Sequence, residues 1–265
     1  MSGKKIKDLL NRPFAKIIFQ YMFDYTNSQI FLNQDRELNH EKYIKFNEIQ
    51  EKIERGIPIQ YAIGKWNFYG RDFTIDENVL IPRPETELLV DKVLKLDLEN
   101  KSILDIGTGS GAIAITLALE SKAMIFASDI SQEALNIAKK NCEKFGAKIN
   151  FYLSDVFNEI PEQKKFDIIV SNPPYLTEQE YLEVDKLLYH EPKNALVSGI
   201  KGYEIYERII QDSKYRLNKN GFLFFEIGFE QGNILKEILE KNGFSNIEIK
   251  KDYGNKDRIV IARLS

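Results

Sequence analysis

The chain has 265 residues, of which 43% are hydrophobic and 29% charged, as in a soluble globular protein of one or two domains. Its net charge of −3 provides no global basic field for bulk nucleic-acid binding. With Cys142 as the single cysteine and only two histidines, we expect no disulfide and no metal site. No apolar stretch approaches the roughly 20 residues that span a membrane, and no signal peptide is evident, so we expect a cytoplasmic protein.

Residues 1–64 are predicted to form a small helical domain. A first helix is expected to start at Asn11, a cap residue shortly before Pro13, because apolar residues then recur at helical spacing. A second start is expected at Asn27 and a longer helix over 41–55. The domain carries no catalytic motif, so its expected role is recognition of the substrate.

The apolar period changes to two after this domain. Residues 65–82 are therefore predicted to be a β-hairpin linker with a turn at Gly70-Arg71. Residues 83–265 form the predicted catalytic domain, entered through an extended stretch at Pro82-Arg83-Pro84. A helix is expected to begin at Leu88.

Strands and helices alternate from about residue 100 onward, which predicts a parallel sheet covered on both faces. A short connection near Gly254 predicts a C-terminal antiparallel hairpin. The predicted fold class is therefore α/β: a doubly wound, mostly parallel, Rossmann-like sheet that ends in an antiparallel hairpin, preceded by the helical domain and the β-hairpin linker. The expected strands are 102–106, 124–128, 149–153, 166–170, 221–227, 244–250 and 258–262.

A glycine-rich loop follows the first of these strands, which has Asp105 near its carboxyl end. The loop consists of Gly107, Thr108, Gly109, Ser110 and Gly111. Glycines let the backbone approach a ligand, and the N-terminus of the following helix favours negative charge. Asp129 ends the next strand, where a carboxylate can accept hydrogen bonds from both ribose hydroxyls.

Polar residues end four predicted strands, at Asp105, Asp129, Asp155 and Asn172. Since the ligand crevice of a parallel sheet lies outside these ends, the pattern predicts a nucleoside-shaped site. The spacing Gly-x-Gly-x-Gly departs from that of dinucleotide sites, and no second cluster is evident to hold a diphosphate. A sulfonium nucleoside such as S-adenosylmethionine has no diphosphate and needs no such cluster. Its adenine would lie near Asp155-Val156.

Within the stretch Asn172-Pro173-Pro174-Tyr175, residues 173 and 174 offer carbonyl acceptors and no backbone donors, because proline has no N–H. A planar NH2 group would suit it. Its two N–H bonds could go to the carbonyls of Asn172 and Pro173, with its plane resting on the Tyr175 ring. The plain alternative is a strand that ends in a proline turn.

These motifs resemble those of class I S-adenosylmethionine-dependent methyltransferases. In that fold, Asn-Pro-Pro-Tyr marks both the adenine-N6 methyltransferases of nucleic acids and the protein glutamine-N5 methyltransferases. The run Pro82-Arg83-Pro84-Glu85-Thr86-Glu87 resembles the glutamine branch that modifies peptide chain release factors. So do four other stretches, Ile59-Gln60-Tyr61, Phe68-Tyr69-Gly70, Glu191-Pro192 with Ala195-Leu196, and Asp252-Tyr253-Gly254.

This resemblance implies methyl transfer from S-adenosylmethionine to the side-chain amide of the glutamine in a Gly-Gly-Gln loop of release factors. Asn172, Pro173 and Tyr175 are the predicted catalytic residues, and these three with Pro174 would contact substrate. Arg83 is expected to lock the linker or to touch substrate, and Glu191 to bond near the pocket or to be a plain loop carboxylate. The predicted cofactor-binding residues are Asp105, Gly107, Thr108, Gly109, Ser110, Gly111, Asp129, Asp155, Val156 and Asn172.

Three other functions stay open from the residues themselves. An adenine-N6 methyltransferase acting on DNA or RNA would need a basic recognition segment, which neither the net charge nor the helical domain supplies. A non-catalytic nucleoside-binding regulator would not need Asn172 and Tyr175. A nicotinamide oxidoreductase fits the strand ends alone. We expect release factors as partners and no direct nucleic-acid binding.

Overall fold

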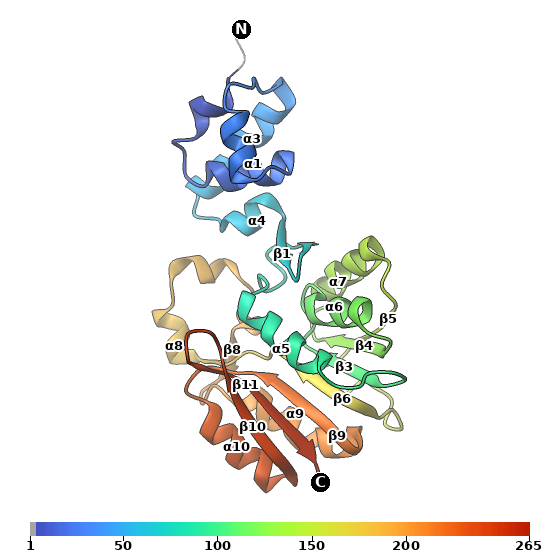
Figure 1. Ribbon diagram of the computed structural model, residues 1–265. Coiled ribbons are helices and arrows are strands. Elements are labelled where there is room, and N and C mark those ends of the chain that lie inside the picture. Colours follow the sequence, from blue (N-terminus) through green and yellow to red (C-terminus); the bar gives the residue numbers. More distant parts are fainter. Residues whose placement is uncertain (1–3) are drawn as a thin grey trace. The chain divides into compact units, whose positions relative to one another are not determined.

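The computed structural model describes residues 4–265. The chain divides into two compact units, Met1–Trp66 and Asn67–Ser265, and Figure 1 colours it in sequence order. Within the described residues, each helix is too short or too polar to cross a membrane.

The first unit is a set of helices packed around its own apolar core, in which the rings of Phe19 and Phe46 stack 5.0 Å apart. The predicted helix start at Asn11 is wrong, because Phe14 adopts a left-handed conformation and the helix begins only after it. The start at Asn27 is confirmed, with Thr26 as its cap. The helices are η1 (Ile6–Leu9), α1 (Ala15–Phe23), α2 (Asn27–Leu32), α3 (His40–Glu54) and α4 (Ile59–Ile63).

The predicted hairpin is present as β1 (Lys65–Phe68) and β2 (Arg71–Thr74). The helix that follows, α5 (Pro84–Leu94), begins four residues before the expected Leu88. Proline is tolerated in the first helical turn because its missing N–H would have no partner there. The Pro-Arg-Pro stretch is therefore partly helix rather than wholly extended.

The second unit is built on a seven-stranded sheet in the order β10-β11-β9-β6-β3-β4-β5. The five strands from β9 to β5 run parallel, and β11 is antiparallel to both β9 and β10. This confirms the predicted mostly parallel sheet with a C-terminal antiparallel hairpin. The strands are β3 (Ser102–Ile106), β4 (Met124–Asp129), β5 (Ile149–Leu153), β6 (Phe166–Ser171), β9 (Leu217–Glu226), β10 (Phe244–Lys251) and β11 (Asp257–Leu264).

Helices cover both faces of this sheet (Figure 1). Ile103 of β3 packs in the core formed with α5, α6 (Ala112–Glu120) and α7 (Gln132–Phe145). The next residue, Leu104, packs in the core formed with α9 (Glu204–Arg216) and α10 (Gly232–Lys241). Since successive strand residues point to opposite faces, a strand covered on both sides must be apolar throughout, as the continuous runs in the sequence indicate.

The segment between β6 and α9 contains short elements outside the expected strands. It holds two short strands that pair in parallel and three short helical pieces. These are β7 (Leu176–Thr177), α8 (Glu178–Glu183), η2 (Lys186–His190), η3 (Lys193–Ala195) and β8 (Val197–Gly199).

A buried carboxylate ties this segment to the residues before α5. Glu191 is 6% exposed. It accepts a hydrogen bond from the Ile81 N–H at 3.1 Å and one from the Arg83 guanidinium at 2.5 Å. Arg83 and Glu191 therefore hold each other, which fits the linker-locking alternative for Arg83.

We expect Glu191→Ala to destabilise the protein by about 1–3 kcal/mol, because the Ile81 N–H and the Arg83 guanidinium lose a buried acceptor. The change is measured as a lower urea midpoint. Glu183→Ala, an exposed carboxylate of α8, serves as the control and should shift the midpoint by much less. Equal midpoints for the two variants would show that the ion pair does not stabilise the fold.

Candidate functional site

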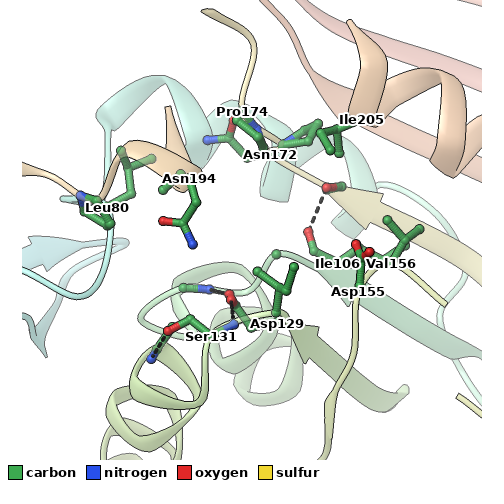
Figure 2. A pocket seen from close by; sticks show the side chains of 18 of the residues that line it. Leu80, Ile106, Asp129, Ser131, Asp155, Val156, Asn172, Pro174, Asn194 and Ile205 are labelled. Carbon is green, nitrogen blue, oxygen red and sulfur yellow. Dashed lines mark hydrogen bonds between the residues drawn. The ribbon is translucent and has the colours of Figure 1, made fainter. Parts of the chain in front are cut away.

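A cavity of about 280 Å³ lies at the carboxyl ends of the parallel strands. The register places Ile106 of β3 opposite Ser128 of β4 and Ser171 of β6. The residues that follow these three positions therefore arrive at one edge of the sheet. Figure 2 shows Asp129 of β4 on one side of this cavity and Asn172, which follows β6, on another.

Eight of the predicted site residues line the cavity. They come from the loop after β3 and from the carboxyl ends of β4, β5 and β6. The eight are Gly107, Gly109, Asp129, Asp155, Val156, Asn172, Pro173 and Pro174. The cavity wall does not include five others, namely Asp105, Thr108, Ser110, Gly111 and Tyr175.

The glycine loop leaves open space beside the cavity. A Cβ atom built on Gly107 or Gly109 would meet no other atom within 4 Å. Both residues have positive φ angles, 71° and 55°, which favour glycine. Gly111 differs, because a Cβ there would lie 2.7 Å from Ile115. Gly111 therefore allows the turn to pack closely against α6, and it does not line the cavity.

The Asp129 carboxylate is oriented by backbone donors. One oxygen accepts from the Gly109 N–H at 2.8 Å and the other from the Ser131 N–H at 2.9 Å. Burial raises the pKa of this carboxyl, and these donors oppose the shift. Each oxygen still has a lone pair for a further hydrogen bond. Ser131 caps α7 through the Ala134 N–H, which leaves Asp129 available to a ligand.

Asp105 lies beneath the loop, fully buried. It accepts a hydrogen bond from the Thr108 hydroxyl at 2.7 Å, and its other oxygen has no partner among residues 4–265. Burial raises its pKa to about 7. Asp105 and Thr108 thus support the loop from below rather than face the cavity.

The end of β5 contributes a charged and an apolar wall. The Asp155 carboxylate pairs with the Arg208 guanidinium at 2.7 Å, and both residues line the cavity. Val156 is buried and has a φ of 57°, a conformation that a β-branched residue rarely adopts. Figure 2 shows the two neighbours together on the cavity wall.

The side-chain NH2 of Asn172 has a hydrogen-bond partner, whereas its side-chain carbonyl does not. Its NH2 donates to the Thr86 hydroxyl at 3.2 Å. Within residues 4–265, its side-chain carbonyl and the Pro173 carbonyl accept no hydrogen bond. Two acceptors without partners therefore belong to adjacent residues of the cavity wall.

Tyr175 is held just behind this wall. Its N–H donates to the Leu196 carbonyl at 3.2 Å, and its own carbonyl accepts from the Gln231 amide at 3.0 Å. Burial raises the pKa of its hydroxyl, and the charge of Glu226 adds to the effect. The ring is packed against the core around α9 and α10.

Sequence reasoning missed several lining residues, among them Asn78, Leu80, Asn194 and Ile205. Asn78 and Leu80 lie before α5, and Asn194 lies within the run Glu191 to Leu196 that already resembled a family motif. Figure 2 shows Asn194 extending between Leu80 and Asp129. The one sequence signal for Asn194 as a lining residue was its polar side chain inside that run, and only the fold brings this residue to the strand ends.

Comparisons with known proteins identify the family to which the chain belongs. Residues 84–201 match the family described as methyltransferase small domain, and residues 11–64 match the PrmC N-terminal domain. The chain is 39% identical over 258 residues to the release factor glutamine methyltransferase of Bacillus subtilis, which covers 94% of this chain and 90% of that protein.

Solved structures show the same fold. A 16S rRNA methyltransferase of T. thermophilus, in complex with AdoMet and guanosine, is similar with a TM-score of 0.57 and 18% identity over 76% of this chain and 50% of that one. The E. cuniculi complex that methylates the termination factor eRF1 gives a TM-score of 0.51 and 21% identity over 71% of this chain and 99% of that one. The identity and coverage of the bacterial relatives place this chain in the release factor glutamine methyltransferase family.

Proposed function

We propose that this protein transfers a methyl group from S-adenosylmethionine to the side-chain amide nitrogen of the glutamine in the Gly-Gly-Gln motif of peptide chain release factors. The observation that carries the proposal is the pair of free acceptors at Asn172 and Pro173, beside an open glycine loop. The names of the relatives supply the class of substrate.

The cavity residues fit an S-adenosylmethionine molecule. The open space over Gly107 and Gly109 would take its amino-acid part, and the free lone pairs of Asp129 would accept from the ribose hydroxyls. Val156 offers an apolar surface for the adenine. When bound, the molecule supplies a methyl carbon activated by a sulfonium.

The chemistry left to the protein is to position a poor nucleophile. The lone pair of an amide nitrogen is delocalised into its carbonyl group. If the Asn172 and Pro173 carbonyls each accept one N–H, the amide is fixed in plane, and negative charge is drawn toward its nitrogen. Positioning of this kind lowers a barrier by several kcal/mol, roughly 7–11 at the limit. No strong base is required, since an N-methylated amide cation loses its proton readily to water.

Tyr175 is proposed to support the amide from behind the cavity wall, and Pro174 to shape the wall itself. The first unit, in which residues 11–64 match the PrmC N-terminal domain, is proposed to recognise the release factor. An adenine-N6 methyltransferase would use the same acceptors, so the substrate must be tested directly.

We therefore expect methyl-labelled S-adenosylmethionine to label a purified release factor when it is offered together with a ribosomal protein and duplex DNA. The label is followed by gel and scintillation counting. A release factor whose Gly-Gly-Gln glutamine is replaced by alanine is the control and should stay unlabelled. Label on DNA with none on the release factor would overturn the proposal.

Asp129→Asn should weaken S-adenosylmethionine binding by about 10- to 100-fold. A hydrogen bond to a charged acceptor contributes about 1.5–3 kcal/mol, and the variant replaces one such oxygen by NH2. Calorimetry gives the dissociation constant. Glu133→Gln, an exposed carboxylate in the first turn of α7, should bind like the wild type. Unchanged affinity in Asp129→Asn would remove Asp129 from the cofactor site.

Asn172→Ala should lower kcat by about 100- to 1000-fold, which is the usual cost of one lost hydrogen-bonding group that stabilises a transition state. Binding of S-adenosylmethionine should change little, because the other cofactor contacts remain. Asn150→Ala, on the exposed side of β5, is the control. Near wild-type kcat in Asn172→Ala would show that the amide is not held as proposed.

A further inference from the structure

A chain of three side chains runs from the interior of the second unit to the cavity. Glu226, at the end of β9, accepts a hydrogen bond from the Thr86 hydroxyl at 2.6 Å. The Thr86 oxygen in turn accepts from the NH2 of Asn172 at 3.2 Å. Glu226 is 2% exposed and Thr86 5% exposed, and only Asn172 lines the cavity. The proposed reaction uses neither of the two buried residues.

The direction of this chain follows from counting protons. A hydroxyl has one hydrogen to donate, whereas an ionised carboxylate can only accept. Because the single hydrogen of Thr86 goes to Glu226, its oxygen can serve the neighbouring amide only as an acceptor. The group of Asn172 that faces Thr86 must then be its NH2, which leaves the carbonyl for the cavity.

We propose that Glu226 and Thr86 are positioning residues that fix the orientation of the Asn172 amide and so keep its carbonyl available to the substrate NH2. The proposal rests on the proposed role of Asn172 as an acceptor. It also gives a physical reason for the threonine in the Pro-Glu-Thr-Glu run, which bonds to Asn172 and Glu226 and does not line the cavity.

Protonation of Glu226 would allow the hydrogen bonds between Glu226, Thr86 and Asn172 to run in the opposite direction. A protonated carboxyl can donate to the Thr86 oxygen, which frees the Thr86 hydrogen for the Asn172 carbonyl and turns the amide NH2 toward the cavity. Burial raises the pKa of Glu226 to about 7, and the bond from Thr86 opposes the rise. Since the ionised form is the competent one, kcat should fall as the pH drops below about 7.

Other charged groups face this carboxylate and must be considered in a pH profile. Arg258 of β11 and Arg83 favour its ionised form, and Glu85 of α5 opposes it. The hydroxyls of Tyr175 and Tyr206 lie near the same charge. Asp105, beneath the glycine loop, also has a pKa of about 7, so cofactor affinity must be measured over the same pH range.

The test compares Thr86→Val, which removes the hydroxyl at nearly constant volume, with Thr86→Ser, which keeps it. We expect kcat for release factor methylation to fall roughly 10- to 100-fold in Thr86→Val, which is the loss seen when residues that orient metal ligands by hydrogen bonds are replaced. Thr86→Ser should restore most of the rate. The dissociation constant of S-adenosylmethionine and the melting temperature are measured for each variant.

A second arm asks whether Thr86 acts through Asn172. The double variant Thr86→Val with Asn172→Ala should be no slower than Asn172→Ala alone, because the oriented group is already absent. Losses that multiply would show that Thr86 acts elsewhere and would overturn the proposal. Full activity of Thr86→Val would overturn it as well.

Glu226→Gln serves if Thr86→Val does not fold. It should be slower than the wild type, and its kcat should lack the fall below about pH 7. An unchanged acid limb in this variant would contradict the proposal. If Asn172→Ala itself keeps full activity, the proposed function of Asn172 fails, and this outcome is distinct from a failure of the orienting chain.

Discussion

The parallel register of β3 with β4 and β6 is the constraint on which the site depends. It places Ser128, Ile106 and Ser171 side by side, so the residues after them meet at one edge although they lie far apart in sequence. The Ser171 hydroxyl donates to the Ile106 carbonyl at 2.7 Å, which adds a side-chain tie at the junction. The strand order reverses at β3, which has β4 on one side and β6 on the other. Ligands of open α/β sheets bind at such a reversal. The glycine loop and Asn172 flank it here.

Buried carboxylates organise the surroundings of this junction. Asp105 supports the glycine loop, Glu191 holds the stretch before α5, and Glu226 holds Thr86. Burying a carboxyl group is costly unless it is hydrogen-bonded, and two of these three have a pKa raised to about 7. None of the three lines the cavity, but each is bonded to a residue close to its wall, and carboxyls with perturbed pKa values cluster at functional sites.

The sequence predicts the sheet well because both faces are covered, so the strands are continuous apolar runs bounded by polar residues. It also places Asp129 and Asn172 at strand ends, since these can be read from such runs, and both residues line the cavity. It does not predict the start of α1, where Phe14 takes a rare backbone conformation. Nor does it show that Asp105 turns away from the cavity, or that Asn194 reaches it. Those facts depend on side-chain direction and on a long-range tie through Glu191, which no local pattern encodes.

The most direct test of this account is a crystal structure of the protein with S-adenosylhomocysteine and a release factor. The account predicts that the glutamine side-chain NH2 donates one hydrogen bond to the Asn172 side-chain carbonyl and the other to the Pro173 carbonyl. In that complex the Asn172 NH2 should still donate to Thr86. A glutamine whose carbonyl oxygen faces Asn172, or whose amide lies away from both acceptors, would contradict the account.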